Sequence, residues 1–293
     1  MAEIKSELPP LNEKERSILL DLVHQNESVL FGNDCRAEAV KRKAAASWAK
    51  GRITGWLLIS ILAASLGSSF IYGYNIGVIN VAGNTIQRWI AESQQFIPMN
   101  TSSDDPLGKT LSDKVFLDSL NENDKAKITF VWSLVGGIFP LGAMFGGLMS
   151  GAIADKFGRK GGMLLNNLLT FAAGLVLFCT KWSGSYYILW LGRFLIGINS
   201  GLNSSLAPMY LTEIAPVNYR GLLGSVSQLV GTIAILIANI LGFEFLLGTE
   251  TLWPYLLGFT IVPAIWQLAT LPLCPESPKY LLISKGQHDH ARN

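Results

Sequence analysis

Long runs without a charged side chain constrain this sequence more than any other feature. No Asp, Glu, Lys or Arg occurs between residues 53 and 87 or between residues 128 and 154. Over the whole chain 15% of residues are charged, whereas a soluble domain carries about 25%. A helix that crosses a bilayer needs about 20 mostly apolar residues, because lipid cannot hydrogen-bond to an exposed backbone. We therefore predict an all-α membrane protein rather than a soluble helical domain.

Six stretches are long and apolar enough to be transmembrane helices. They cover approximately residues 54–80, 128–154, 161–180, 186–210, 221–243 and 252–273. The predicted six-helix domain is thus 53–273, with a long loop at 81–127. A polar arm, 1–52, precedes it without a signal-peptide pattern, and 274–293 begins a linker. In the arm, Glu15, Leu19 and Leu20 belong either to an amphipathic surface helix or to an acidic dileucine sorting signal.

The Lys and Arg counts of the connections predict the orientation of the chain. The arm, the second-to-third and fourth-to-fifth connections and the C-terminal segment together hold sixteen, whereas the other side holds six. Because the side rich in Lys and Arg is cytoplasmic, both termini are expected inside the cell, at the plasma membrane. The 81–127 loop is then extracellular, where the sequon Asn100-Thr101-Ser102 can be glycosylated.

Polar residues at membrane depth are the first candidates for function. Arg193 lies in the fourth stretch, and a charge there is costly unless it faces a cavity or a partner. The six stretches contain no Asp, Glu or His, so Arg193 has to be satisfied by amides, hydroxyls, carbonyls or water. The amides either line a polar interior or bridge helices, and both interpretations stay open: Asn75, Asn80, Asn199, Asn203, Gln228 and Asn239.

Glycines at a spacing of four residues predict close helix packing, which matters in lipid because water does not drive helices together. They occur in the second and fourth stretches: Gly142, Gly146, Gly147, Gly151, Gly197 and Gly201.

The composition argues against several classes of function. The net charge of +2 is too small to indicate a nucleic-acid partner. The three cysteines have no metal-ligand spacing, and the three histidines lie in polar tails: Cys35, Cys179, Cys274, His24, His288 and His290. We therefore expect no metal site, no cofactor and no enzyme activity.

Five short motifs occur in order along the chain. They are GYNIGVIN from Gly73, DKFGRK from Asp155, GRFLIG from Gly192, the set Tyr210, Glu213, Pro216, Arg220 and Gly221, and PESPKYLL from Pro275. Together they resemble the sugar porters of the major facilitator superfamily, and most of all the animal facilitative glucose transporters. The resemblance implies the N-terminal half of a twelve-helix fold, whose six helices form a three-plus-three inverted repeat.

The resemblance also implies roles for three residues at membrane depth. Gln228 matches an amide of the fifth helix that hydrogen-bonds the sugar, and Tyr72 stands where relatives often have a Phe that packs on a sugar face. Asn75 resembles the position at which proton-coupled relatives have an acidic residue near the fourth-helix Arg. Because an amide does not titrate, this favours facilitated diffusion over proton symport.

The cytoplasmic motifs imply a gate that is closed on the inside in the outward-facing state. In the family such residues pair with charges of the other half, and here they are Arg159, Lys160, Glu213, Arg220, Glu276 and Lys279. Lys160 and Lys279 replace Arg, which removes bidentate geometry and predicts weaker pairs. Without the resemblance they would be interpreted as solvated charges at helix ends.

The chain has about half the length that this resemblance requires. Our main hypothesis is facilitative uniport of a hexose such as glucose, with this chain as the N-terminal half and with the bilayer and a C-terminal six-helix half as its partners. One alternative is a truncated half that does not transport but binds or regulates full-length transporters. The other is a major-facilitator transporter of another solute, such as an organic ion.

Overall fold

The computed structural model describes residues 55–94, 113–243, 246–249 and 251–283. The chain divides into two compact units, one comprising Met1–Arg52 with Pro216–Asn218 and the other Ile53–Ala215 with Tyr219–Asn293. The second unit contains all six predicted spans. The polar arm with its dileucine sequence and the sequon at Asn100 lie outside the described residues.

The described residues form helices and no strands, which confirms the all-α prediction. In chain order they are α3 (Gly55–Ala64), the π-helical turn η2 (Ser65–Ser69), α4 (Phe70–Val81), α5 (Gly83–Ser93), α7 (Asp113–Asp118), α8 (Glu122–Phe157), α9 (Arg159–Ser183), α10 (Tyr186–Ile214), η3 (Val217–Tyr219), α11 (Arg220–Leu241), α12 (Trp253–Gly258), α13 (Ile261–Thr270), η4 (Leu271–Leu273) and α14 (Pro278–Ile283). The first predicted span is thus built from α3, η2 and α4, and the sixth from α12, α13 and η4.

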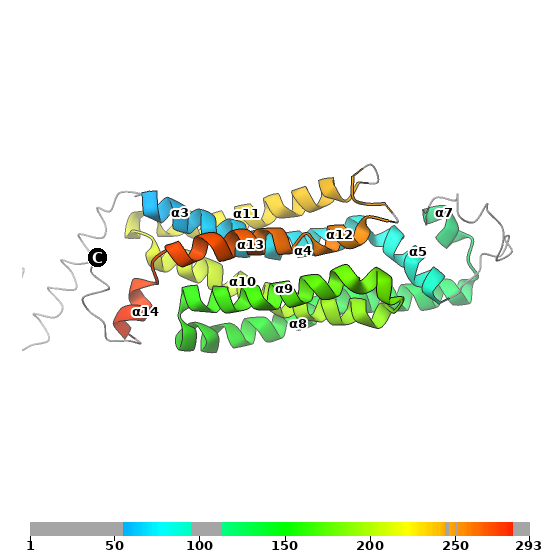
Figure 1. Ribbon diagram of the computed structural model, residues 1–293, viewed down its shortest axis with the longest axis horizontal. Helices are drawn as coiled ribbons and strands as arrows, with labels where there is room; N and C mark the ends of the chain where they lie inside the picture. The colour runs from blue at the N-terminus through cyan, green and yellow to red at the C-terminus, as the bar shows by residue number, and fades with distance from the viewer. Residues whose placement is uncertain (1–54, 95–112, 244–245, 250, 284–293) are drawn as a thin grey trace, which may run out of the picture. The chain divides into compact units, whose positions relative to one another are not determined.

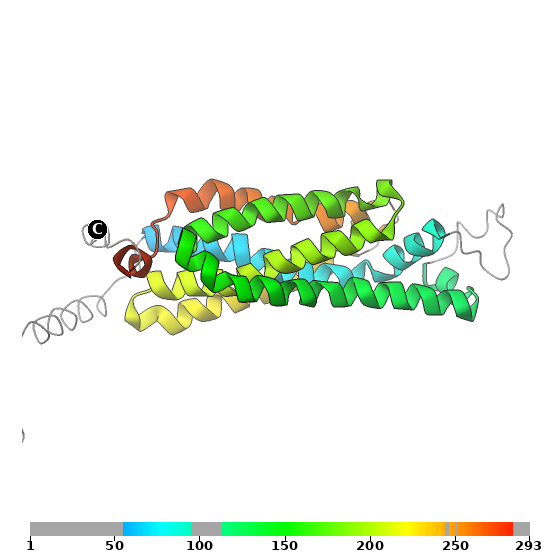
Figure 2. The same cartoon turned by 90° about the horizontal axis from the view of Figure 1, so that it is seen from below.

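Within this unit the long helices run side by side (Figure 1), with α14 at one end and α5 and α7 at the other. The view turned by 90° shows the same arrangement (Figure 2). Five helical segments among the described residues are long and apolar enough to cross a membrane: Gly55–Val81, Glu122–Phe157, Arg159–Ser183, Arg220–Leu241 and Trp253–Leu273. The remaining predicted span is α10, which is 29 residues long but contains no continuous stretch apolar enough to be counted with these five.

The polarity of α10 has a physical explanation, because α10 is surrounded by other helices. It packs against α8, α9, α11 and α4, and the polar side chains of Arg193, Asn199, Ser200 and Asn203 are all buried. A helix that is covered on most sides need not present an apolar surface to lipid. A long apolar stretch therefore identifies the peripheral spans of this unit more readily than it identifies the central span, α10.

Glycines bring the backbones of α8 and α10 into direct contact. A Cβ added at Gly146 would lie 2.1 Å from the carbonyl oxygen of Ile198, and one added at Gly201 would lie 2.1 Å from that of Ala143. Any side chain at these positions would force the helices apart. By contrast, nothing lies within 4 Å of the same point at Gly147.

The other glycines of the two stretches divide in the same way. Gly142 and Gly197 also lie against the backbone of the facing helix, but Gly151 has open space around its Cβ position. Gly142, Gly146, Gly197 and Gly201 therefore have the predicted packing role, and within the described part of the chain Gly147 and Gly151 do not.

The glycines of the GYNIGVIN motif serve a second close contact, between α4 and α11. A Cβ at Gly73 would lie 2.0 Å from the carbonyl oxygen of Gly231, and one at Gly77 would lie 3.0 Å from that of Ile235. Between them on α4, the buried Tyr74 hydroxyl donates a hydrogen bond to the carbonyl of Leu256, at 2.8 Å. The motif thus joins the first span to the fifth and sixth.

Buried amides join α9 to α10. Asn166 Nδ2 donates to Asn203 Oδ1 at 2.9 Å and to the carbonyl of Asn199 at 3.1 Å. Asn199 Nδ2 donates in return to the carbonyl of Asn166 and to Thr170 Oγ1, at 3.0 and 2.6 Å. For Asn199 and Asn203 the helix-bridging interpretation is therefore correct, since these amides are buried and occupied.

Two adjacent glycines provide a matched test of the α8–α10 contact. Gly146→Ala should lower the stability of the chain in detergent by about 1–3 kcal/mol, because the new methyl group overlaps a backbone carbonyl. Gly147→Ala should leave stability unchanged or raise it by up to about 1 kcal/mol, because alanine favours helix and the site is open. Thermal unfolding midpoints would measure both, and equal midpoints for the two variants would contradict the packing described here.

Candidate functional site: a buried arginine, a polar helix face and a charge cluster at the helix ends

Arg193 lies in the interior of the bundle, where 1% of its surface is exposed. Its NH1 group donates a hydrogen bond to the backbone carbonyl of Asn75 at 3.2 Å. The guanidinium carbon lies 4.4 Å from the centre of the Phe139 ring, within the range of a cation–π interaction. A carbonyl and an aromatic face thus stabilise the charge, and no acidic side chain pairs with Arg193 among the described residues.

Asn75 is next to Arg193, as the resemblance implied, but its side chain is completely buried. Its Nδ2 group donates to the carbonyl of Ile71 in its own helix at 2.8 Å. Its Oδ1 atom is buried without a hydrogen-bond partner in the described part of the chain. Of the three residues predicted to bind substrate, Asn75 is therefore the one that this conformation shields.

The surface of α11 has three faces of different chemistry. Small residues pack into the bundle: Ser227, Gly231, Ala234 and Ala238. Large apolar residues form an exposed stripe: Leu222, Leu229, Ile233, Leu236 and Ile240. Beside that stripe, a second exposed stripe carries Ser225, Gln228 and Thr232. Lipid suits the apolar stripe, whereas polar groups at membrane depth need a polar neighbour.

Tyr72 lies on α4 next to the polar stripe of α11. Its Cδ1 atom is 3.8 Å from the point that a Cβ of Gly231 would occupy, one turn of α11 from Gln228. The ring is partly exposed, and Gln228 is exposed. These two residues, which the sequence analysis selected separately, therefore lie on neighbouring helices and face outward from the bundle.

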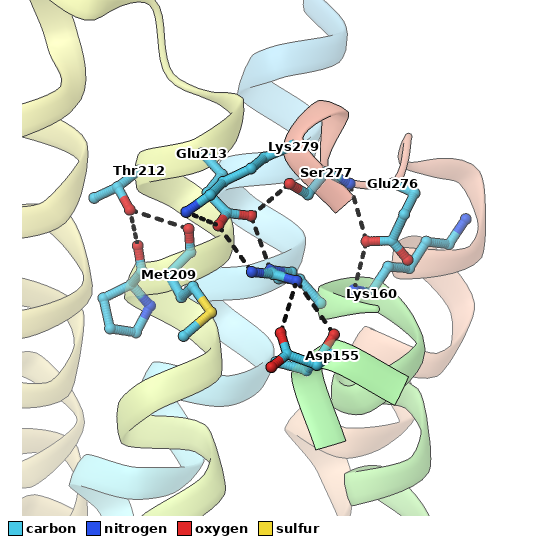
Figure 3. Close-up of polar contacts among 11 residues, drawn as sticks. Asp155, Lys160, Met209, Thr212, Glu213, Glu276, Ser277 and Lys279 are labelled. Atoms are coloured by element: carbon cyan, nitrogen blue, oxygen red, sulfur yellow. Dashed lines mark hydrogen bonds and ion pairs between the residues drawn. The ribbon is translucent and has the colours of Figure 1, made fainter. Parts of the chain in front are cut away.

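At the other end of α10, Glu213 is the centre of a charge cluster (Figure 3). Its Oε2 atom lies 2.9 Å from Arg159 Nε, and its Oε1 atom accepts a hydrogen bond from Arg159 NH2 at 3.2 Å. Only about a tenth of either side chain is exposed. Arg159 also donates to the carbonyl of Ala154 at 3.2 Å, and its NH1 lies 3.7 Å from Asp155. The pair thus joins the start of α9 to the end of α10.

The same carboxylate holds the segment that follows the sixth span. The Ser277 hydroxyl donates a hydrogen bond to Glu213 Oε2, and Lys279 Nζ lies 3.6 Å from Oε1. The Lys279 side chain is 60% exposed, so its contribution is weak. Figure 3 shows Ser277 and Lys279 approaching Glu213 from α14 and the residues before it.

Glu276 and Lys160 form a second part of the cluster by capping two helix ends. Glu276 Oε1 accepts hydrogen bonds from the backbone N–H groups of Lys160 and Ser277, at 3.0 and 2.9 Å. A carboxylate at the N-terminus of α9 also interacts favourably with the helix dipole. Lys160 Nζ donates to the carbonyls of Pro272 and Cys274, at 2.8 and 2.7 Å. Each side chain therefore satisfies backbone groups that a helix end leaves free.

Gly158 makes room for this arrangement. Its φ of 82° lies in the left-handed region, which favours glycine. A Cβ at this position would lie 2.6 Å from Glu276 Oε2 and 2.9 Å from the Tyr280 ring. The glycine of the DKFGRK motif is thus required by both the turn and the neighbours.

Arg220 was predicted to join this group, but it lies apart from it. Its side chain is exposed, and Nε donates to the carbonyl of Thr212 at 3.1 Å.

Three hydroxyl groups of the cluster were not predicted. Besides Ser277, the Tyr210 hydroxyl donates to the carbonyl of Pro275 at 2.8 Å, and the Tyr280 hydroxyl donates to that of Lys156 at 3.1 Å. All three residues belong to the five sequence motifs, and their membership in these motifs could have identified them as part of the cluster.

The cluster can be tested on the isolated chain. Glu213→Gln should lower its stability in detergent by about 3 kcal/mol, because the buried Arg159 loses the carboxylate that compensates its charge. Lys279→Met, which removes an exposed partner of the same carboxylate, should cost between about 0 and 1 kcal/mol. Chemical unfolding of the purified variants gives both values. A Glu213→Gln protein as stable as Lys279→Met would show that the buried pair is not formed.

Known proteins resemble this chain in sequence and in structure. Residues 60–293 match the family model for sugar (and other) transporters. Facilitated glucose transporter protein 1 of Caenorhabditis elegans is 43% identical over 243 residues, which is 83% of this chain and 43% of that protein. Solute carrier family 2, facilitated glucose transporter member 4 of Homo sapiens is 42% identical over 246 residues, with coverages of 82% and 44%. The chain thus spans less than half the length of these curated relatives.

Among solved structures, the chain resembles the major facilitator superfamily proton:xylose symporter XylE bound to 6-bromo-6-deoxy-D-glucose. The TM-score is 0.60 at 22% sequence identity, over 80% of this chain and 48% of that one. The partially occluded inward-open xylose transporter XylE from E. coli gives a TM-score of 0.58, with coverages of 81% and 52%. These similarities show a major-facilitator fold, of which the chain covers about half. With the match over residues 60–293, the chain belongs to the sugar (and other) transporter family, a family of transporters and not of enzymes.

Proposed function

We propose that this chain is the N-terminal half of a carrier that moves a hexose such as glucose across the membrane by facilitative uniport. The observation that carries the proposal is the exposed polar stripe of α11, on which Gln228 lies one turn from Gly231, the residue that the partly exposed ring of Tyr72 approaches. An amide that donates and accepts hydrogen bonds, next to an aromatic ring, matches the hydroxyl groups and the apolar face of a sugar. The relatives named as facilitated glucose transporters support the same substrate class.

Uniport is favoured over proton coupling by the groups around Arg193. A proton-coupled carrier needs a group that gains and loses a proton during its cycle. The six predicted spans contain no Asp, Glu or His, and an arginine stays protonated at physiological pH. Asn75, which provides the backbone carbonyl for Arg193, has an amide side chain that cannot titrate.

The cytoplasmic cluster is proposed as the inner gate of the carrier. Arg159, Lys160, Glu213 and Glu276 are occupied by contacts within this half, so they hold the inner helix ends together. Arg220 and Lys279 are exposed and make only a backbone contact and a weak ion pair within this half, so these two are the residues proposed to approach charges of a C-terminal half.

The proposed location is the plasma membrane, with both termini and the gate on the cytoplasmic side. The lysine and arginine counts support this orientation. It makes Asn100 an extracellular glycosylation site. A glycosidase should therefore increase the electrophoretic mobility of the chain from animal cells, but not that of an Asn100→Gln variant. An epitope at residue 2 that is labelled on intact cells would contradict the orientation.

The alternative is that the chain does not transport but binds and regulates full-length carriers. The chain matches 43% and 44% of the lengths of the two relatives described above, so transport by the chain alone and transport by a fusion are tested separately. A third possibility, a different solute such as an organic ion, is left open by the breadth of the family description. Both alternatives predict different results in the following experiment.

The experiment is a fusion of these 293 residues to the C-terminal half of the C. elegans relative, reconstituted in liposomes. D-glucose should enter until it reaches the external concentration and no further, with or without an inward proton gradient, and L-glucose should not enter. The chain alone should not transport. Accumulation that a protonophore abolishes would contradict uniport. An inactive fusion whose chain, when co-expressed, inhibits the intact relative would favour the regulatory alternative.

The sugar contact is tested in the same fusion. Gln228→Ala should raise the half-saturation concentration for D-glucose about 2- to 10-fold, because each lost hydrogen bond is worth roughly 0.5–1.5 kcal/mol. Leu229→Ala, on the adjacent apolar stripe, should leave it unchanged. If the two variants have the same half-saturation concentration, Gln228 does not contact the sugar.

A further inference from the structure

A polar cavity is lined by residues of α5, α7 and the first turns of α8. These elements lie at the end of the unit opposite α14 (Figure 1). We propose that this cavity binds a hexose at the extracellular entrance, before the sugar reaches Gln228; the proposal rests on the function and orientation proposed above. Its volume is about 280 Å³, close to the lower limit of typical small-molecule sites.

The cavity presents the donors and acceptors that a sugar needs. Asn84 and Gln87 lie one turn apart on α5, and the Thr129 hydroxyl faces them from α8. None of these three side chains forms a hydrogen bond to another described residue, so all remain available to a ligand. Leu117 and Ile128 add apolar surface to the lining, which suits the C–H groups of a sugar ring.

The charges of the lining favour a neutral ligand over an anion or a cation. Lys125 is paired with Glu122 at 3.0 Å. The other charged residues of the cavity, Lys114 and Asp118, are one of each sign and lie four residues apart on the same side of α7. A phosphate or a metal ion would find no excess of opposite charge here, whereas a polyhydroxylated neutral molecule needs none.

A buried ion pair holds the walls of the cavity in place. Arg88 on α5 is 3% exposed, and its NH1 lies 3.1 Å from the carboxylate of Asp113 at the start of α7. The Thr85 hydroxyl donates to the same carboxylate at 2.7 Å, and the Arg88 guanidinium lies 5.0 Å from the Phe116 ring centre. Because α7 is anchored to α5 through these groups, little ordering is required when a ligand binds.

The cavity lies beyond the end of α4, the helix that carries Tyr72. The exposed Asn80 lies one turn before Asn84, and the partly exposed Tyr72 lies two turns before Asn80 on the same helix. α4 ends at Val81 and α5 begins at Gly83, so Asn84 lies just past the break between the two helices. A hexose bound by Asn84 and Gln87 would therefore lie at the outer end of the span that carries Tyr72.

The test uses the 293-residue chain in detergent micelles, with D-glucose binding measured by saturation-transfer NMR and L-glucose as the control sugar. A Gln228→Ala background removes the proposed central contact. In that background, Asn84→Ala with Gln87→Ala should raise the dissociation constant for D-glucose about tenfold. The matched double variant Asn123→Ala with Gln94→Ala removes two exposed amides that lie outside the cavity lining and should change it less than twofold.

Unchanged binding after loss of Asn84 and Gln87 would overturn the proposal, as would displacement of the glucose signal by inorganic phosphate. If circular dichroism shows that the double variant does not fold, Thr129→Val is used in its place. A change of less than twofold in the dissociation constant for D-glucose of that variant would contradict the site. Glucose binding that depends on Asn84 and Gln87, in a chain whose fusion does not transport, would support the cavity while rejecting the proposed function.

Discussion

The backbone contact between α8 and α10 is the interaction on which the rest of the structure depends. In lipid, two helices gain no hydrophobic free energy by meeting, so close approach and polar bridges decide which helices pack together. Gly146 and Gly201 allow that approach with no side chain between the helices. Because α10 is fixed in this way, its first half places Arg193 beside Asn75 and its C-terminal end places Glu213 beside Arg159.

The two ends of the unit are held by the same kind of interaction. At the end of the unit that carries α14 the buried pair of Arg159 and Glu213 joins the third and fourth spans, and at the opposite end Arg88 and Asp113 join α5 to α7. Both arginines are buried, and each lies close to an aromatic ring. Fixed ends favour motion of this half as a unit, and transport by rocking of two halves requires such motion.

The positions of the helices along the chain could be predicted from the sequence more accurately than the contacts between them. Apolar length locates a span because it reflects the thickness of the bilayer, and glycine spacing selected the residues of the α8–α10 contact. The same spacing could not separate Gly146 from Gly147, because periodicity does not say which face of a helix meets a partner. For the same reason Asn199 could have lined a path but instead bridges two helices, and Arg220 lies apart from the cluster although it belongs to the same motif as Glu213.

The two lysines that replace arginine show why such a substitution has no fixed cost. An arginine at either position would offer a planar fork, which suits a carboxylate. Among the described residues the Lys160 side chain meets no carboxylate; its ammonium group donates to the carbonyls of Pro272 and Cys274, for which a compact charge with three donors is well suited. Within this half, Lys160 therefore makes a contact that does not need the fork of an arginine. Lys279 does approach a carboxylate, at 3.6 Å and largely exposed, and there the loss of the fork leaves a weak pair. The effect of having lysine in place of arginine therefore depends on the group that the side chain contacts, and not on the motif to which the residue belongs.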